Sequence, residues 1–155
     1  MALSRGPALA LATVAAGLVL PGDWPQVSTR HPVRAPTVTI IARDYTFEAP
    51  DTLPSGPTTF TLLNRGTVKH EVSLMLLRPD QTIADIRRGP TPEDRRNSVE
   101  APIGVLFAPP GQASPAQLTT TLLPGRTYIL ACNLRDAVDM PLHFNMGMVD
   151  SLRAK

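Results

Sequence analysis

Apolar and polar residues alternate with a period of two along much of this chain. Five segments show the pattern clearly: 37–42, 58–63, 70–76, 117–123 and 126–132. In the first of them, Val38, Ile40 and Ala42 fall on one face. Successive side chains of a strand point to opposite faces, so this period predicts β-strands with one buried side.

Turn-forming residues separate the alternating segments. The chain has 17 prolines and 10 glycines, and clusters such as Leu53–Pro57, Asn64–Thr67 and Pro124–Gly125 fall between the segments. About seven short strands with turns roughly every 8 to 15 residues predict an all-β, antiparallel β-sandwich. The spacing does not favour βαβ units.

One region, 78–116, interrupts the strand pattern and predicts a short helical or irregular insertion. Residues 82–88 have the length of one or two helical turns, with Asp80 as the candidate cap. Thr91 begins a second short helix, which we expect to be exposed and to include Arg95.

The remaining segments predict loops. The stretch 102–115 is rich in proline, glycine and alanine and predicts a long loop over the core, with an edge strand as the alternative. A loop at 133–142 precedes a return of the chain at 143–149. The last residues, 150–155, are expected to form a polar tail.

The N-terminal region predicts export. Residues 1–23 resemble a secretory signal peptide, because Pro7–Leu20 is an apolar run of 14 residues, too short to span roughly 30 Å of hydrocarbon. Residues 24–36 form a proline-rich linker in which His31 is expected to be a solvated loop residue, and the folded domain covers 37–152. The predicted location is periplasmic or secreted, without stable membrane insertion after cleavage; an uncleaved anchor is the alternative.

Charge and composition exclude several function classes. Fifteen basic and 13 acidic residues give a net charge of +2, and aromatic residues make up 5%. The arginines form no run and are not interleaved with aromatic residues, so a nucleic-acid partner is not expected. No Ser-His-acid set or pair of acids stands out, and we expect no enzymatic activity.

Soft metal ligands concentrate near the C-terminal end. The only cysteine, Cys132, is followed by His143 and Met148, while His70 begins a strand-like run upstream. By parity, His70 begins a core-facing row and Cys132 ends one. Two histidines, one cysteine and a weak methionine form the ligand set of a blue-copper site, and Met146 competes with Met148 for the axial position.

The sequence alone also allows purely structural roles for these residues, without a bound metal. A histidine at the polar end of a core-facing row is often a hydrogen-bonded rim residue. A lone cysteine is often a small buried hydrophobe.

Two stretches resemble the cupredoxin family of plastocyanin- and azurin-like blue-copper proteins. The segment 64–70, NRGTVKH, is similar to the turn that delivers the family's first histidine, and 128–149 is similar to its C-terminal Cys-His-Met loop. The resemblance implies a Greek-key β-sandwich with one type 1 copper ion. The resemblance also implies that the copper ligands are His70, Cys132, His143 and Met148.

This chain departs from the family pattern at two points. Ten residues separate Cys132 from His143, more than in plastocyanin or azurin. Glu71 follows the first histidine, where many relatives carry Asn or Ser, so control of the thiolate by hydrogen bonding is not predicted by the resemblance.

The expected function is that of an exported, monomeric one-electron carrier. A redox partner is expected to dock near His143, on an apolar rim, unless the rim residues instead pack the loop onto the sandwich. Those residues are Met140, Pro141, Leu142 and Phe144. The alternatives are copper storage or delivery with the same ligands, and a metal-free binding module of the same fold.

Overall fold

A computed structural model describes residues 34–155. The predicted signal peptide 1–23, His31 and most of the linker 24–36 lie outside the described residues.

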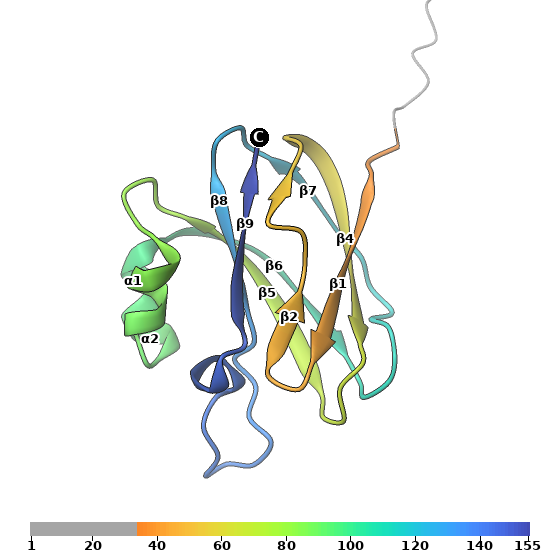
Figure 1. Ribbon diagram of the computed structural model, residues 1–155, viewed down its shortest axis with the longest axis vertical. Helices are drawn as coiled ribbons and strands as arrows, with labels where there is room; N and C mark the ends of the chain where they lie inside the picture. Colours follow the sequence, from red (N-terminus) through yellow and green to blue (C-terminus); the bar gives the residue numbers. More distant parts are fainter. Residues whose placement is uncertain (1–33) are drawn as a thin grey trace, which may run out of the picture. The chain divides into compact units, whose positions relative to one another are not determined.

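The described chain forms two packed sheets (Figure 1). The four-stranded sheet has the order β2 (Thr46–Glu48), β1 (Thr37–Arg43), β4 (Gly56–Asn64), β7 (Leu118–Leu122). The five-stranded sheet has the order β3 (Thr52–Leu53), β9 (Val149–Ala154), β8 (Thr127–Ala131), β5 (His70–Leu77), β6 (Val99–Ala108).

The core lies between the two sheets and follows the predicted parity. Val72 and Leu74 of β5 are each 1% exposed, and they belong to the same core cluster as Phe60 of β4, which is fully buried. Leu130 of β8 and Cys132, which follows the last residue of β8, extend the same core. The predicted β-sandwich with a short helical insertion is therefore confirmed.

Two strand pairs are parallel rather than antiparallel. β1 runs parallel to β4, with Val38 opposite Phe60, and β3 runs parallel to β9. The chain reverses from β1 into β2, then joins the other sheet through β3, and returns beside β1 in β4. This crossover between sheets gives β1 and β4 the same direction, so the sandwich is mixed and not purely antiparallel.

Two segments without a clear alternating pattern form strands. The region predicted as a loop contains β6, an edge strand paired only with β5 in its sheet, which corresponds to the alternative interpretation. The predicted polar tail is wrong, because Leu152 and Ala154 enter the core from β9. The chain returns through η2 (His143–Met146), a 3-10 helix, before β9 begins.

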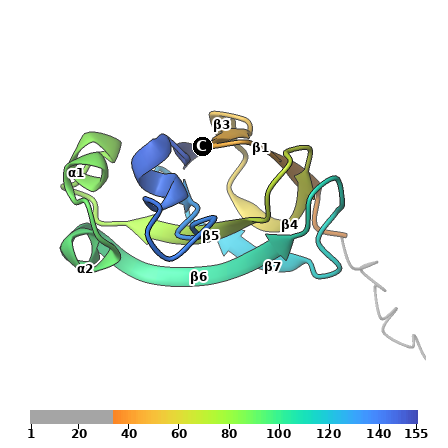
Figure 2. The same ribbon diagram turned by 90° about the horizontal axis from the view of Figure 1, so that it is seen from below.

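The insertion consists of α1 (Ile83–Arg88), α2 (Pro92–Arg95) and η1 (Arg96–Ser98), beside the five-stranded sheet (Figure 2). Thr82 caps α1 through a reciprocal pair of hydrogen bonds with Asp85, so the cap predicted at Asp80 is wrong. Ile86 packs on the outer face of the sheet, where Ile129 of β8 is also buried. The helices thus cover a second apolar cluster.

Arg95 is buried, contrary to the expected exposed helix. It is 4% exposed, and its guanidinium donates to the Gly89 carbonyl at 2.8 Å and to Asn133 Oδ1 at 2.6 Å. The same group lies 3.6 Å from the centre of the Phe144 ring. One arginine therefore joins the insertion to the start of the 133–142 loop and to η2, which follows the loop.

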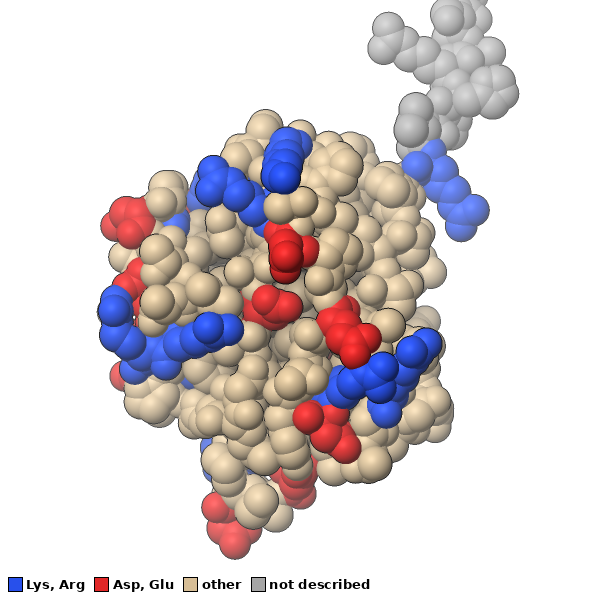
Figure 3. All heavy atoms as spheres, in the orientation of Figure 1, with Lys and Arg blue, Asp and Glu red and all other residues tan. Residues whose placement is uncertain are grey.

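The surface carries mixed charge. On the face seen in Figure 3, Lys and Arg form several separate groups with Asp and Glu between them. Within residues 34–155, no helix has the length and apolar character needed to cross a membrane.

Candidate metal centre

Three elements deliver the predicted ligands to one end of the sandwich. His70 is the first residue of β5, Cys132 follows the last residue of β8, and His143 begins η2. β5 and β8 pair with Ser73 opposite Ala131, which places the start of one strand beside the end of the other. The strand start at His70 and Glu71 therefore lies beside Cys132, and the Glu71 amide lies 3.5 Å from the Cys132 sulfur although the two residues are 61 positions apart.

The turn before His70 is fixed by Asn64. Its side-chain amide donates to the Val68 carbonyl at 2.8 Å and to the Ala108 carbonyl at 3.0 Å. Its side-chain oxygen accepts from the Gly66 amide at 2.8 Å. Asn64 is fully buried, so these bonds form away from water and hold the turn that leads to His70.

The 133–142 loop closes over Cys132 through backbone hydrogen bonds. The Phe144 amide donates to the Cys132 carbonyl at 2.8 Å, and the His143 amide donates to the Leu134 carbonyl at 2.8 Å. The Met148 amide donates to the His143 carbonyl at 3.0 Å. The long spacing between Cys132 and His143 therefore does not separate them.

Three donor atoms converge inside this end. His70 Nδ1 lies 3.2 Å from His143 Nδ1, and Cys132 Sγ lies 3.4 Å from His143 Nδ1. One ligand atom from each residue lies within 4.8 Å of the others, and all three residues are fully buried. Donors bound to one ion at about 2.0 to 2.3 Å are roughly 3.3 to 3.8 Å apart in a tetrahedral arrangement. The spacing fits a single metal ion.

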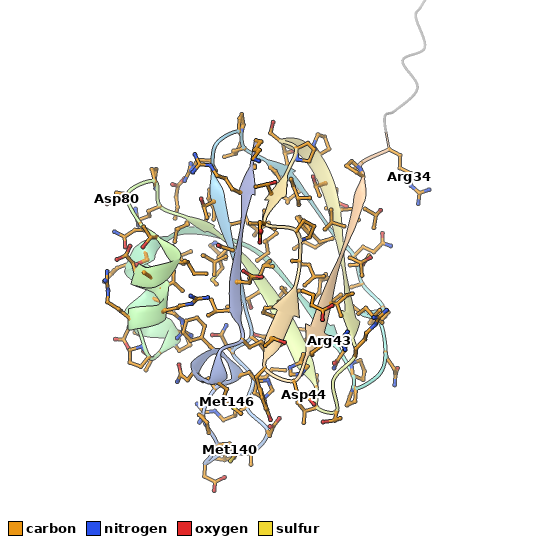
Figure 4. The ribbon with its side chains drawn as sticks, viewed as in Figure 1. Arg34, Arg43, Asp44, Asp80, Met140 and Met146 are labelled. Carbon is orange, nitrogen blue, oxygen red and sulfur yellow. The ribbon has the colours of Figure 1, made fainter. Side chains whose placement is uncertain are left out.

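The three nearby methionines lie in different surroundings. Met148 is fully buried in the core cluster that contains Cys132, and its carbonyl accepts from the Cys132 amide at 3.1 Å. Met146 lies on η2 and is partly exposed, and Met140 is 41% exposed on the loop (Figure 4). Of these three methionines, Met148 is therefore the one that shares the buried core with Cys132.

Burial dominates the electrostatics of the donors. It raises the pKa of the Cys132 thiol to about 11, despite the Glu71 amide that donates to Sγ at 3.5 Å. Burial also lowers the pKa of His70, against the opposing effect of a hydrogen bond to Asp44. Without a cation, both effects favour the uncharged thiol and the neutral imidazole.

Glu71 has a structural role that the resemblance does not supply. Its carboxylate accepts from the Asn133 amide at 3.0 Å and from the Ser73 hydroxyl at 3.2 Å, and the residue is 7% exposed. The side chain therefore fixes the residue after Cys132, while its backbone amide faces the sulfur. The Glu71 carboxylate thus holds the chain just after β8 by accepting hydrogen bonds.

Three residues around the site were missed by sequence reasoning: Asp44, Tyr45 and Asp136. His70 Nε2 lies 3.2 Å from Asp44 Oδ1, and His143 Nε2 lies 3.0 Å from Asp136 Oδ1. The Tyr45 hydroxyl donates to Asp136 Oδ2 at 2.6 Å. No local signal marks them, because each occupies a turn or loop and meets its partner only after the sheets pack.

The apolar residues beside His143 do not form the expected rim as a group. Leu142 and Phe144 are 9% and 4% exposed and belong to the second apolar cluster, so they pack the loop onto the sandwich. The ring of Tyr45 lies edge-on to His143, with the ring centres 5.0 Å apart. His143 is therefore covered rather than presented at the surface.

Comparison with known proteins supports the fold. No protein-family model matches the chain, and no curated protein is similar to it in sequence. The solved structure of dithionite-reduced auracyanin from the photosynthetic bacterium Roseiflexus castenholzii is 17% identical, with a TM-score of 0.52 over 78% of this chain and 98% of that chain. Auracyanin B is 18% identical, with a TM-score of 0.51 over 78% of this chain and 89% of that chain. The described chain therefore has the cupredoxin-like fold, with a buried set of two histidines and one cysteine, and Met148 beside it in the core.

Proposed function

We propose that this protein binds one copper ion through His70, Cys132 and His143, with Met148 as the axial ligand, and carries single electrons. The observation that carries the proposal is the convergence of two imidazole nitrogens and one thiol sulfur in a fully buried pocket. Nitrogen and thiolate donors with a weak thioether favour copper over magnesium or calcium. Bound copper would supply a Cu(II)/Cu(I) couple.

The burial of the three donor residues also favours electron transfer over copper delivery. A delivery site must exchange its ion with a partner, which requires at least one ligand to be reachable. Here all three donor residues are fully buried, and the 133–142 loop closes over them. His70 and Cys132 lie at the ends of two paired strands, and His143 is held by backbone hydrogen bonds. Ligands fixed in this way need little rearrangement between the oxidation states, so we favour the carrier over storage or delivery and over a metal-free module.

The expected partner is a redox protein that docks transiently at the metal end of a monomer. The buried position of His143 means that docking would occur over Tyr45 and the 133–142 loop, where Val138 is 91% and Met140 is 41% exposed. Electron-transfer encounters use small, short-lived interfaces. Export to the periplasm or the cell exterior is part of the same proposal, and burial of Cys132 would protect its thiol there.

Titration of the purified protein with Cu(II) tests the proposal. We expect saturation at one ion per chain, accompanied by intense visible absorption from charge transfer between thiolate and copper. A colourless one-to-one complex would favour delivery, and absence of binding would leave the metal-free module.

Copper affinity is expected to rise with pH. The folded apoprotein keeps a proton on Cys132, whose pKa is about 11, whereas the metal-bound sulfur is a thiolate. The pKa of His70 is below its ordinary value, so its ring is already neutral above pH 7. One proton is therefore released, and the apparent affinity should increase about tenfold per pH unit between pH 7 and 9. Competition against a chelator at pH 7, 8 and 9 measures this slope, and a flat profile would contradict it.

Replacement of Met148 by leucine should raise the redox potential while the colour remains. The thioether is a weak donor that tunes the potential, and leucine fills a similar volume without donating. We expect a rise of about 60 mV or more, equivalent to a tenfold shift in relative affinity towards Cu(I). Voltammetry of Met148→Leu and of the matched Met146→Leu variant distinguishes the two sulfurs: a shift only in Met146→Leu would reverse the assignment.

A further inference from the structure

Each candidate copper-binding imidazole is hydrogen-bonded on its outer side to an aspartate. His70 Nε2 faces Asp44 Oδ1 at 3.2 Å, and His143 Nε2 faces Asp136 Oδ1 at 3.0 Å. An ionised carboxylate only accepts hydrogen bonds, so Nε2 must be the donor in both pairs. In a neutral imidazole the other nitrogen, Nδ1, then carries the lone pair.

This tautomer aims both lone pairs at the same point. The two Nδ1 atoms lie 3.2 Å apart, and the Cys132 Sγ atom lies 3.4 Å from the Nδ1 atom of His143. When each ring carries its proton on its own Nε2, no hydrogen lies between the two Nδ1 atoms, and their lone pairs repel each other. A cation between them removes that repulsion, so the aspartates prepare the pocket for a metal rather than for a hydrogen bond between histidines.

Asp44 is itself held in place. It accepts from the Thr67 amide at 2.8 Å and from the Thr67 hydroxyl at 2.7 Å. Gly66 permits this approach, because a Cβ there would overlap Asp44 Oδ1 and lie 3.0 Å from His70 Nε2. The turn that precedes β5 thus supplies both the histidine and the support for its carboxylate.

Asp136 is held by Tyr45, the neighbour of Asp44. The Tyr45 hydroxyl donates to Asp136 Oδ2 at 2.6 Å, and its ring lies edge-on to the rings of His143 and His70. Tyr45 has a φ of 67°, in the left-handed region that is unfavourable for a bulky residue. The turn between β1 and β2 therefore adopts a strained backbone that directs two adjacent side chains to the two imidazoles.

We propose that Asp44 and Asp136 are positioning residues that fix both imidazoles for copper and lower the redox potential of the site. Their negative charge makes each hydrogen-bonded imidazole a stronger donor, which stabilises Cu(II) more than Cu(I). This inference rests on the proposed function and adds the residues that regulate its potential.

Charge-neutralising variants test the effect on potential. Asp136→Asn and Asp44→Asn keep an oxygen that accepts the hydrogen bond but remove the charge. Loss of such an outer partner typically lowers metal affinity by about 10- to 100-fold. We expect a loss of at least tenfold for Cu(II) relative to Cu(I), which equals a rise of about 59 mV for a one-electron couple. Tyr45→Phe, which frees Asp136, should produce a smaller rise in the same direction.

The control is Asp139→Asn, which removes the same charge from an exposed position on the same loop. Its potential should remain close to the wild-type value. Equal potentials in Asp136→Asn, Asp44→Asn and Asp139→Asn would overturn the inference while the copper site itself stands. Absence of copper binding by the wild-type protein would instead overturn the proposed function, and this inference with it.

A measurement on the apoprotein tests the orientation without copper. Long-range proton–nitrogen NMR spectra at pH 8 should show His70 and His143 with the proton on Nε2. In Asp136→Ala, which removes the acceptor, His143 should populate both tautomers while His70 is unchanged. A wild-type spectrum with the proton on Nδ1 of either ring would contradict the proposal.

Discussion

Replacement of Cys132 by serine is expected to abolish the visible absorption of the copper-loaded protein. The absorption requires a thiolate bound to Cu(II), and a hydroxyl of similar size cannot supply it at neutral pH. Two imidazoles remain, so weak and colourless Cu(II) binding can persist. Visible spectra and copper analysis after gel filtration measure both properties in one sample.

The matched control for Cys132→Ser is Met140→Leu. This variant removes another sulfur from the same end of the molecule, but from a side chain that is 41% exposed. It should keep the full absorption and one copper per chain. If Cys132→Ser retained the colour, or if Met140→Leu lost it, the assignment of Cys132 as the thiolate ligand would be wrong.

The largest expected loss of stability comes from Arg95→Ala. Arg95 is buried, bonded to Gly89 and Asn133, and stacked on Phe144. Its removal loses hydrogen bonds from a charged group and a desolvated cation–π contact, and it leaves Asn133 Oδ1 without this partner. We expect the free energy of unfolding to fall by about 3 kcal/mol.

Urea unfolding of the apoprotein measures this loss, with Arg96→Ala as the control. Arg96 is the next residue, but its ion pair with Glu93 is exposed, with side-chain exposures of 73% and 74%. Exposed pairs contribute little, so Arg96→Ala should cost less than about 0.5 kcal/mol. Similar losses in the two variants would show that the buried contacts of Arg95 do not stabilise the insertion.

The core-facing rows could be predicted because strand parity is local information. His70 and Cys132 each belong to a run whose alternate residues are apolar, and both are buried as that parity requires. The same reasoning fails for β6, where Pro102 and Gly104 hide the pattern. An edge strand tolerates proline because only one of its sides is paired within the sheet, so composition alone did not distinguish the strand from a loop.

The supporting residues of the site could not be predicted from local pattern. Asp44 and Asp136 lie 26 and 7 positions from the histidines that they contact. An aspartate in a turn is ordinarily a solvated turn former, and nothing nearby in the sequence distinguishes these two. Arg95 was likewise expected on an exposed helix face. Its burial could not be predicted locally, because its partner Asn133 is 38 residues away in the sequence.

Reversible redox cycling of the copper-loaded protein tests the central claim most directly. The account predicts that one electron per copper bleaches the visible absorption, that reoxidation restores it fully, and that the copper stays bound throughout in the presence of a chelator. Loss of the ion on reduction, or a bound Cu(II) that shows no thiolate absorption and accepts no electron, would contradict the account.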